Sequence, residues 1–214
     1  MTGLRRILPT LLLALTVLGA GVGLAHAQAR PQPIPRVTAA DHVLGNPGAP
    51  VTVVEYGSMV CPHCAEWQIA NFYAFKARFI DTGQVRFVFR DMLTEPAEQA
   101  ATAAAIARCG APERYFDVVH QLMLWQGTAR NFGPISDWYD KAVAAGGRPP
   151  EEVRACVADP ATREAINAQM ARGVAAGVTK TPTFFVNGVM TTDGSMDALA
   201  AAIDAAQSSS AAGR

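Results

Sequence analysis

One tetrapeptide, Cys61-Pro62-His63-Cys64, constrains the fold of this 214-residue chain more than any other feature. An apolar, β-branched run ending at Tyr56 comes before it, and apolar residues at helical spacing follow it over residues 67–80. This change of period predicts a strand that leads into a helix. Cys61 then stands at the start of the helix, and Cys64 stands one turn further along.

The two cysteines of this tetrapeptide are suited to thiol–disulfide exchange. Unpaired backbone N–H groups and the positive end of the helix dipole favour an anion at a helix N-terminus. We therefore expect Cys61 to have a lowered pKa and to be the attacking sulfur, while Cys64 resolves the mixed disulfide. Pro62 suits the first turn because it lacks an N–H that would be unpaired there. His63 can donate a hydrogen bond or a positive charge to the thiolate and lower its pKa further.

Two other interpretations of the tetrapeptide have less support. A zinc site on Cys61, His63 and Cys64 would need a second pair of ligands at similar spacing, but the other two cysteines, Cys109 and Cys156, are isolated. A purely structural disulfide would close a very short loop and gain little chain entropy. No metal cluster, phosphate loop or hydrolase triad stands out, so we expect redox chemistry with no metal and no other cofactor.

Residues 1–27 have the pattern of a secretory signal peptide. Arg5 and Arg6 precede an apolar stretch, and Ala25-His26-Ala27 matches the small-x-small cleavage pattern, so we predict cleavage before Gln28. An uncleaved membrane anchor is the alternative, although three glycines weaken the apolar segment and its length is at the lower limit for a span. Export would place the chain in the periplasm, an oxidising compartment where disulfides persist.

The remainder of the chain is predicted to form one domain. The proline-rich residues 28–40 read as an extended lead-in, residues 41–207 as the folded domain and residues 208–214 as a flexible tail. Without the signal peptide the chain keeps 16 basic and 18 acidic residues. This near-neutral balance gives no support for nucleic acid or an anionic membrane surface as a partner. We expect the protein to act as a monomer.

The order of the predicted elements defines the fold class. A strand over 51–56, the helix after the tetrapeptide and a strand over 85–90 form a β-α-β unit, whose strands should be parallel. A strand over 183–186 turns at Asn187-Gly188 into an antiparallel partner over 189–191. A last helix runs from Met196 to Ala206. The segments predicted to be helical between the second and third strands are 96–107, 113–125, 135–145, 150–157 and 161–175.

This order resembles the thioredoxin fold, and the helical block, about residues 94–178, looks like the helical insertion of the DsbA family of exported thiol–disulfide oxidoreductases. Two stretches carry the resemblance: VVEYGSMVCPHC, residues 53–64, and TPTFFVNG, residues 181–188. The resemblance implies an α/β thioredoxin fold with an all-helical insertion between the second strand of the β-α-β unit and the strand that begins after Thr181-Pro182.

The resemblance also implies roles for individual residues. Pro182 matches the cis-proline that faces the active-site disulfide, where backbone groups of Thr181 are free to pair with an extended substrate peptide. An ordinary trans proline opening an edge strand is the alternative. Glu55 matches a buried acidic residue that relays protons to or from Cys64, and a solvated charge at a strand end is its alternative. The Cys-Pro-His-Cys sequence matches the strongly oxidising members of the family.

Cys109 and Cys156 both fall in the predicted helical insertion. Because exported cysteines are usually paired and the loop between these two is long, we expect a structural disulfide. Such a second bridge is similar to that of some members of the family. A regulatory role and a pair of free thiols are the alternatives.

The function that the resemblance implies is an exported oxidase. It would introduce disulfide bonds into exported proteins through the Cys61–Cys64 pair and be reoxidised by a membrane quinone-linked partner. An isomerase or reductase of the same fold is one alternative, although we expect no additional N-terminal dimerisation domain before residue 41. A peptide-binding chaperone module without turnover is another, but such a module has no need of two thiols at a helix N-terminus.

Overall fold

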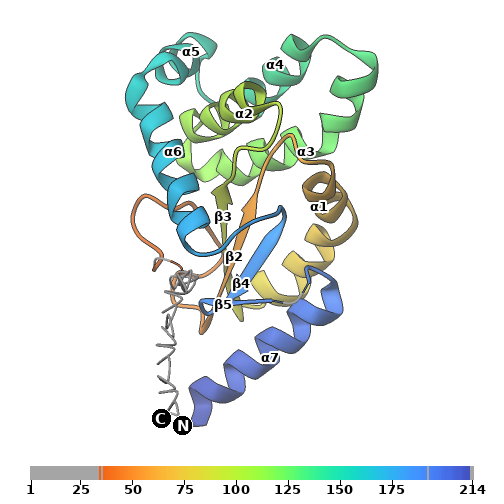
Figure 1. Ribbon diagram of the computed structural model, residues 1–214, viewed down its shortest axis with the longest axis vertical. Helices are drawn as coiled ribbons and strands as arrows, with labels where there is room; N and C mark the ends of the chain where they lie inside the picture. The colour runs from red at the N-terminus through yellow and green to blue at the C-terminus, as the bar shows by residue number, and fades with distance from the viewer. Residues whose placement is uncertain (1–33, 35, 192, 213–214) are drawn as a thin grey trace, which may run out of the picture. The chain divides into compact units, whose positions relative to one another are not determined.

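The computed structural model describes residue 34, residues 36–191 and residues 193–212 (Figure 1). The predicted signal peptide, with its cleavage site before Gln28, lies outside the described residues, as does most of the predicted lead-in. In the part of the chain that is described, no helix is both long enough and apolar enough to cross a membrane.

A mixed five-stranded sheet forms the centre of the domain. Its strands lie in the order β1-β3-β2-β4-β5. The two central strands, β2 and β3, are parallel over their whole lengths, as predicted, and the other neighbours are antiparallel. The strands are β1 (Val43–Leu44), β2 (Val51–Gly57), β3 (Val85–Asp91), β4 (Thr183–Val186) and β5 (Val189–Met190).

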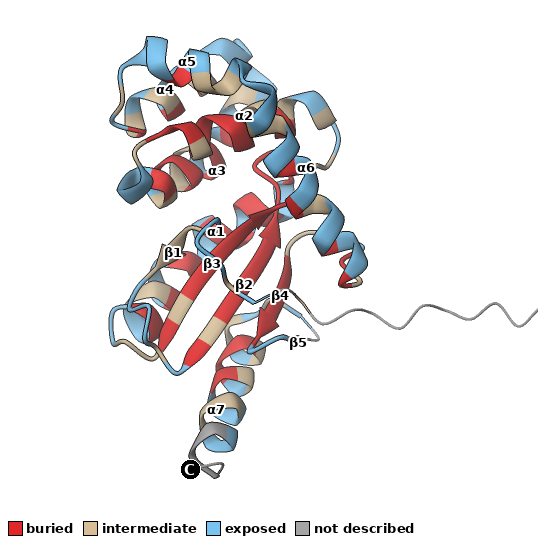
Figure 2. Cartoon of the chain, turned by 90° about the vertical axis from the view of Figure 1, so that its left-hand side faces the viewer, coloured by how far each residue is buried: buried red, intermediate tan, exposed pale blue. Residues whose placement is uncertain are grey.

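Alternate residues of the central strands enter two different apolar clusters, which is why both faces of the sheet are covered (Figure 2). Phe87 and Phe184 face α1 (Pro62–Phe75), where Trp67 packs against both rings. The helix α7 (Met196–Ala212) adds Leu199 and Ile203 to the same cluster. Helix α1 continues as a π-helical turn over Lys76–Ile80, so the predicted helix from the tetrapeptide to residue 80 is present.

Every helix of the predicted insertion is present between β3 and β4. In Figure 1 the helices α2 to α5 group beyond the carboxyl ends of β2 and β3, the end of the sheet from which the tetrapeptide emerges. The helices are α2 (Ala97–Cys109), α3 (Tyr115–Phe132), α4 (Ile135–Ala145), α5 (Pro150–Ala158) and α6 (Pro160–Ala175), with a short 3-10 helix over Pro112–Arg114. Helix α3 is longer than predicted: it runs through Gly127 and ends at Phe132, before Gly133 and Pro134.

Two predicted boundaries are wrong. Helix α7 continues past residue 206 to Ala212, so the predicted flexible tail begins inside a helix. The serines near its end are compatible with a helix, because Ser208 and Ser209 donate hydrogen bonds to carbonyl oxygens one turn back, both at 2.9 Å. At the other end, the fold includes part of the predicted lead-in. The buried guanidinium of Arg90 donates to the carbonyl oxygen of Arg36 and pairs with Asp41.

Candidate active site

The tetrapeptide lies at the carboxyl end of β2, at the predicted junction of strand and helix. Cys61 caps α1 with an extended backbone, φ −78° and ψ 120°, and the helix begins at Pro62. Both cysteines are free thiols in this structure, and Cys61 is 7% exposed while Cys64 is fully buried. The two sulfurs therefore share one site but differ in their access to solvent.

The surroundings of Cys61 favour its thiolate. A hydrogen bond from the Cys64 thiol is the largest influence, and together with Thr181 and the backbone N–H groups of His63 and Cys64 it lowers the pKa of Cys61 to about 5, against the opposing effect of burial. In its protonated form the Cys61 thiol donates to the carbonyl oxygen of Thr181 at 3.5 Å. Cys61 can therefore attack or leave as a thiolate at neutral pH.

The pKa of Cys64 is shifted in the opposite direction. Burial raises its pKa well above the usual range, and the hydrogen bond to Cys61 and the charge of Glu55 raise it further. The backbone N–H of Ser58 donates to the Cys64 sulfur at 3.5 Å and offsets part of this effect. The inner sulfur is therefore a thiol that donates to the outer thiolate.

Glu55 lies on β2 with no exposed surface, so it is not a solvated charge at a strand end. Neither of its carboxyl oxygens has a hydrogen-bond partner among the described residues. Burial, followed by the negative charge of Cys61, raises the pKa of Glu55 to about 8. Gly57 makes room for it, because a Cβ there would lie 3.0 Å from one Glu55 oxygen and 2.6 Å from the Phe89 ring. Glu55 is thus a protonated acid at neutral pH, in electrostatic contact with both sulfurs.

The Thr181–Pro182 peptide bond is cis, and this segment lines the approach to the sulfurs. An open groove of about 580 Å³ starts at His63 and runs between α1 and residues 180–184 toward β5. Its floor includes Trp67, whose indole N–H donates to the carbonyl oxygen of Gly194 at 2.6 Å. The groove is lined by Thr181 and Pro182 on one side and by His63 and Glu66 of α1 on the other.

The side chain of His63 does not contact the sulfur, contrary to the hydrogen bond that the sequence analysis considered. Its imidazole is 77% exposed and pairs with Glu66 at 3.0 Å. The hydrogen bond to Glu66, the charge of Glu66 and then the charge of Cys61 raise the pKa of His63. The backbone N–H of His63, and not its imidazole, is among the groups that lower the pKa of Cys61.

Two side chains that hold the active-site loop, Ser58 and Gln126, were not predicted from the sequence. The Ser58 hydroxyl accepts from Thr94 at 2.9 Å, and the buried amide of Gln126 donates to the carbonyl oxygens of Met59 and Cys61. Gln126 follows Leu122 by one helical turn on the buried face of α3. A polar residue at that spacing was the available signal, but the sequence does not say which loop it contacts.

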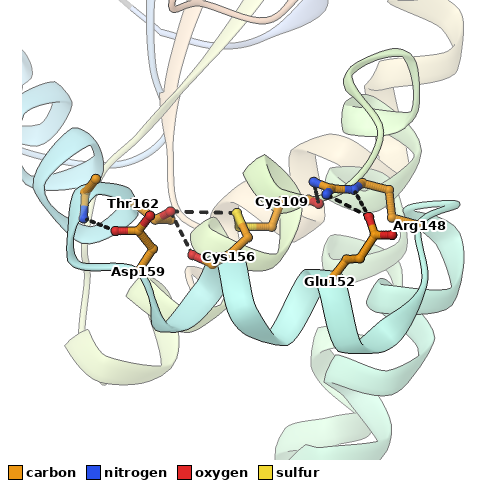
Figure 3. Close-up of a disulfide and its surroundings, with 7 residues drawn as sticks. Cys109, Arg148, Glu152, Cys156, Asp159 and Thr162 are labelled. Carbon is orange, nitrogen blue, oxygen red and sulfur yellow. Dashed lines mark hydrogen bonds and ion pairs between the residues drawn. A yellow bond between two sulfur atoms is a disulfide. The ribbon is translucent and has the colours of Figure 1, made fainter.

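The other two cysteines are joined by a disulfide, Cys109–Cys156, which ties the end of α2 to α5 (Figure 3). Hydrogen bonds hold both ends of this bridge. Thr162 donates to the carbonyl oxygen of Cys156 at 2.8 Å, and Arg148, itself paired with Glu152, donates to that of Cys109 at 3.1 Å. Among the described residues, no group of three or more histidines, cysteines and acidic residues is placed to hold a metal ion.

Comparison with known proteins agrees with this geometry. A family model described as "Thioredoxin" matches residues 37–205. A relative from Rickettsia bellii, named "Putative protein-disulfide oxidoreductase", is 34% identical over 176 residues, which are 78% of this chain and 64% of the relative. The corresponding Rickettsia felis protein is 35% identical over 78% of this chain and 60% of its own length. The chain thus spans less than two thirds of these relatives.

Solved structures share the architecture at low sequence identity. The crystal structure of Wolbachia pipientis α-DsbA1 superposes with a TM-score of 0.72 at 21% identity, covering 82% of this chain and 95% of that one. The oxidised form of BdbD from Bacillus subtilis gives 0.72 at 23% identity, with the same coverage. These structures show that the fold is that of the DsbA proteins. With the family model matched over most of its length, the chain belongs to the thioredoxin family.

Proposed function

We propose that this chain is a protein thiol–disulfide oxidoreductase that acts as an oxidase, introducing disulfide bonds into exported proteins through Cys61 and Cys64. The observation that carries the proposal is the contrast between the two sulfurs. The pKa of Cys61 is lowered to about 5 while that of Cys64 is raised. The names of the Rickettsia relatives support the same class of reaction.

The reaction starts from the Cys61–Cys64 disulfide. A substrate thiolate attacks the Cys61 sulfur, the enzyme disulfide breaks, and Cys64 leaves with the electron pair. Cys64 takes up a proton, for which the protonated Glu55 is the nearby buried donor. A second substrate thiolate then attacks the substrate sulfur of the mixed disulfide and releases Cys61 as a thiolate. Two electrons pass from the substrate to the enzyme, and the substrate gains one disulfide.

The direction of the reaction follows from the stability of the released thiolate. Stabilising Cys61 as a thiolate stabilises the dithiol form, so the disulfide form tends to accept electrons from substrate thiols. A leaving thiol with a low pKa also departs faster. Both effects favour an oxidase over a reductase.

The substrate in this proposal is an extended segment of a folding protein. The backbone of Thr181 faces Cys61, and the groove between α1 and this segment continues from His63. A peptide in the groove can pair with the Thr181 backbone, as in strand addition. This binding would use main-chain groups and so accept many sequences.

The reduced enzyme must be reoxidised before it can act again. We propose that its two electrons pass to a membrane quinone-linked partner, as the DsbA resemblance implies. We also propose export to the periplasm by the signal peptide of residues 1–27 and a structural role for the Cys109–Cys156 disulfide. That bridge joins two helices of the insertion, α2 and α5.

A Cys64→Ala variant should trap the first covalent step. Mixed with oxidised glutathione near pH 7, it should gain one glutathione at Cys61, detected by mass, and keep it because no resolving thiol remains. The wild-type disulfide should oxidise a reduced, unfolded protein with one substrate disulfide formed per enzyme disulfide consumed. Cys61→Ser should do neither. A wild-type protein that leaves the substrate thiols unoxidised, or an adduct that forms with Cys61→Ser, would contradict the proposed function.

A further inference from the structure

The loop that carries Cys61 is held by a side chain from the helical insertion. Gln126 lies on α3, 65 positions further along the chain, and is 3% exposed. Its amide nitrogen donates to the carbonyl oxygen of Met59 at 2.7 Å and to that of Cys61 at 3.0 Å. One amide therefore binds the backbone on both sides of residue 60 and reaches the residue that bears the attacking sulfur.

These two hydrogen bonds fix the peptide that joins Cys61 to α1. The Cys61 carbonyl oxygen also accepts from the backbone N–H of Ala65 at 3.2 Å, which is the first bond of the helix. With Gln126 as a second donor, this carbonyl has a defined direction. The φ and ψ of Cys61, and hence the direction of its Cα–Cβ bond, follow from that peptide and from the Met59 carbonyl held on the other side.

The direction of the Cα–Cβ bond decides which groups the sulfur meets. The Cys61 thiolate depends on the Cys64 thiol, on Thr181 and on the backbone N–H groups of His63 and Cys64. Hydrogen bonds weaken steeply when distance or angle departs from the optimum, so a small rotation at Cys61 weakens all of them together. The donated N–H groups of Gln126 also offset the negative ends of two carbonyl groups close to the thiolate.

We propose that Gln126 is a positioning residue for thiol–disulfide exchange, which holds the Met59 and Cys61 carbonyl groups so that the Cys61 sulfur stays among the donors that stabilise its thiolate. The inference rests on the proposed function of Cys61 and Cys64. In this proposal, helix α3 of the helical insertion does more than pack beside the active site: through Gln126 it also helps to set the reactivity of Cys61.

The test replaces Gln126 by methionine, which has similar length and no N–H donor. Gln126→Met should raise the midpoint of the Cys61 thiolate titration by about one pH unit, a tenfold change in the thiolate equilibrium. The equilibrium with glutathione near pH 7 should shift by about tenfold toward the enzyme disulfide. The reduced protein should lose more stability than the oxidised protein, because the thiolate interactions are present only in the reduced form. Gln126→Asn, whose amide is one methylene shorter, should change the same quantities in the same direction by less.

Gln169 offers a matched control. It is also 3% exposed and lies in the insertion, on α6, but its amide oxygen accepts from the backbone N–H of Asp91 at 2.8 Å and from Arg108. Gln169→Met should lower the stability of both redox forms equally and leave the titration of Cys61 unchanged. If both Gln126 variants behave like Gln169→Met, the role of Gln126 is structural and the inference is overturned. A wild-type protein without a low titration midpoint would instead overturn the proposed function.

Discussion

Replacing Glu55 by glutamine should stabilise the reduced protein by about 4 kcal/mol at pH 8. In the unfolded chain this carboxyl ionises near its ordinary pKa of 4.5, whereas in the folded protein its pKa is about 8. The folded state therefore holds a proton that the unfolded state has released, and stability is lost as the pH rises from 4.5 to 8. Glutamine is neutral throughout, so it removes this loss, and its unpartnered amide resembles the protonated acid.

The gain should disappear at pH 4, where the carboxyl is protonated in both states, and reach about 3 kcal/mol at pH 7. Denaturant unfolding at each pH measures it, with Glu164→Gln, an exposed position on α6, as the control that should change little. An equal stability of wild type and Glu55→Gln from pH 4 to pH 8 would mean that Glu55 titrates as a solvated group.

The same variant should be a slower enzyme. Glutamine cannot give a proton to Cys64 as that sulfur leaves, and removing a general acid typically slows such a step by about a hundredfold. The rate at which the enzyme disulfide reacts with a reduced peptide, followed by rapid quenching with acid, measures this step. A more stable protein that is also slower would place Glu55 in the proton transfer and exclude a purely structural role.

The second large effect is on the pH dependence of the two redox forms. Because the pKa of Cys61 is lowered from 9 to about 5, the thiolate contributes stability that is fully present above pH 9 and is lost as the pH falls through 5. The oxidised protein has no thiolate. The stability of the reduced form relative to the oxidised form should therefore rise by about 4 kcal/mol between pH 5 and pH 8.

Taking the difference between redox forms removes the main effect of Glu55, since its burial raises its pKa in both forms and only the smaller effect of the Cys61 charge is confined to the reduced form. Thermal or denaturant unfolding of the oxidised protein and of the protein kept in excess reductant measures the difference at each pH. The Cys61→Ser variant, which has no thiolate, should have a stability difference from the oxidised form that does not grow with pH. A wild-type difference that is equally flat would contradict a thiolate stabilised by the folded structure.

Local patterns explain what the sequence predicted correctly. The strand before Cys61 and the helix after it follow from hydrophobic periods that each span only a few residues. The hairpin is equally local, because Asn187 and Gly188 both adopt positive φ, at 47° and 87°, as the Asn-Gly turn requires. The Cys109–Cys156 bond was predictable because only two cysteines remained once the tetrapeptide was assigned.

The features that sequence analysis missed depend on contacts between distant segments. The short strand β1 forms because Val43 pairs with Val88, and nothing near residue 43 indicates this partner. Gln126 reaches Cys61 only after α3 has packed against α1. The position of the His63 imidazole depends on a local choice between two partners. It pairs with Glu66, because a carboxylate one turn along α1 is a better partner than a sulfur behind the end of the helix.

The most direct test of the central claim is an ultraviolet titration of the Cys61 thiolate combined with equilibration of the Cys61–Cys64 pair in a glutathione redox buffer. We predict a titration midpoint near 5 and a reduction potential well above the roughly −270 mV of a reducing thioredoxin. A midpoint near that of an ordinary cysteine, together with a potential in the thioredoxin range, would contradict an oxidase and indicate a reductase with the same fold.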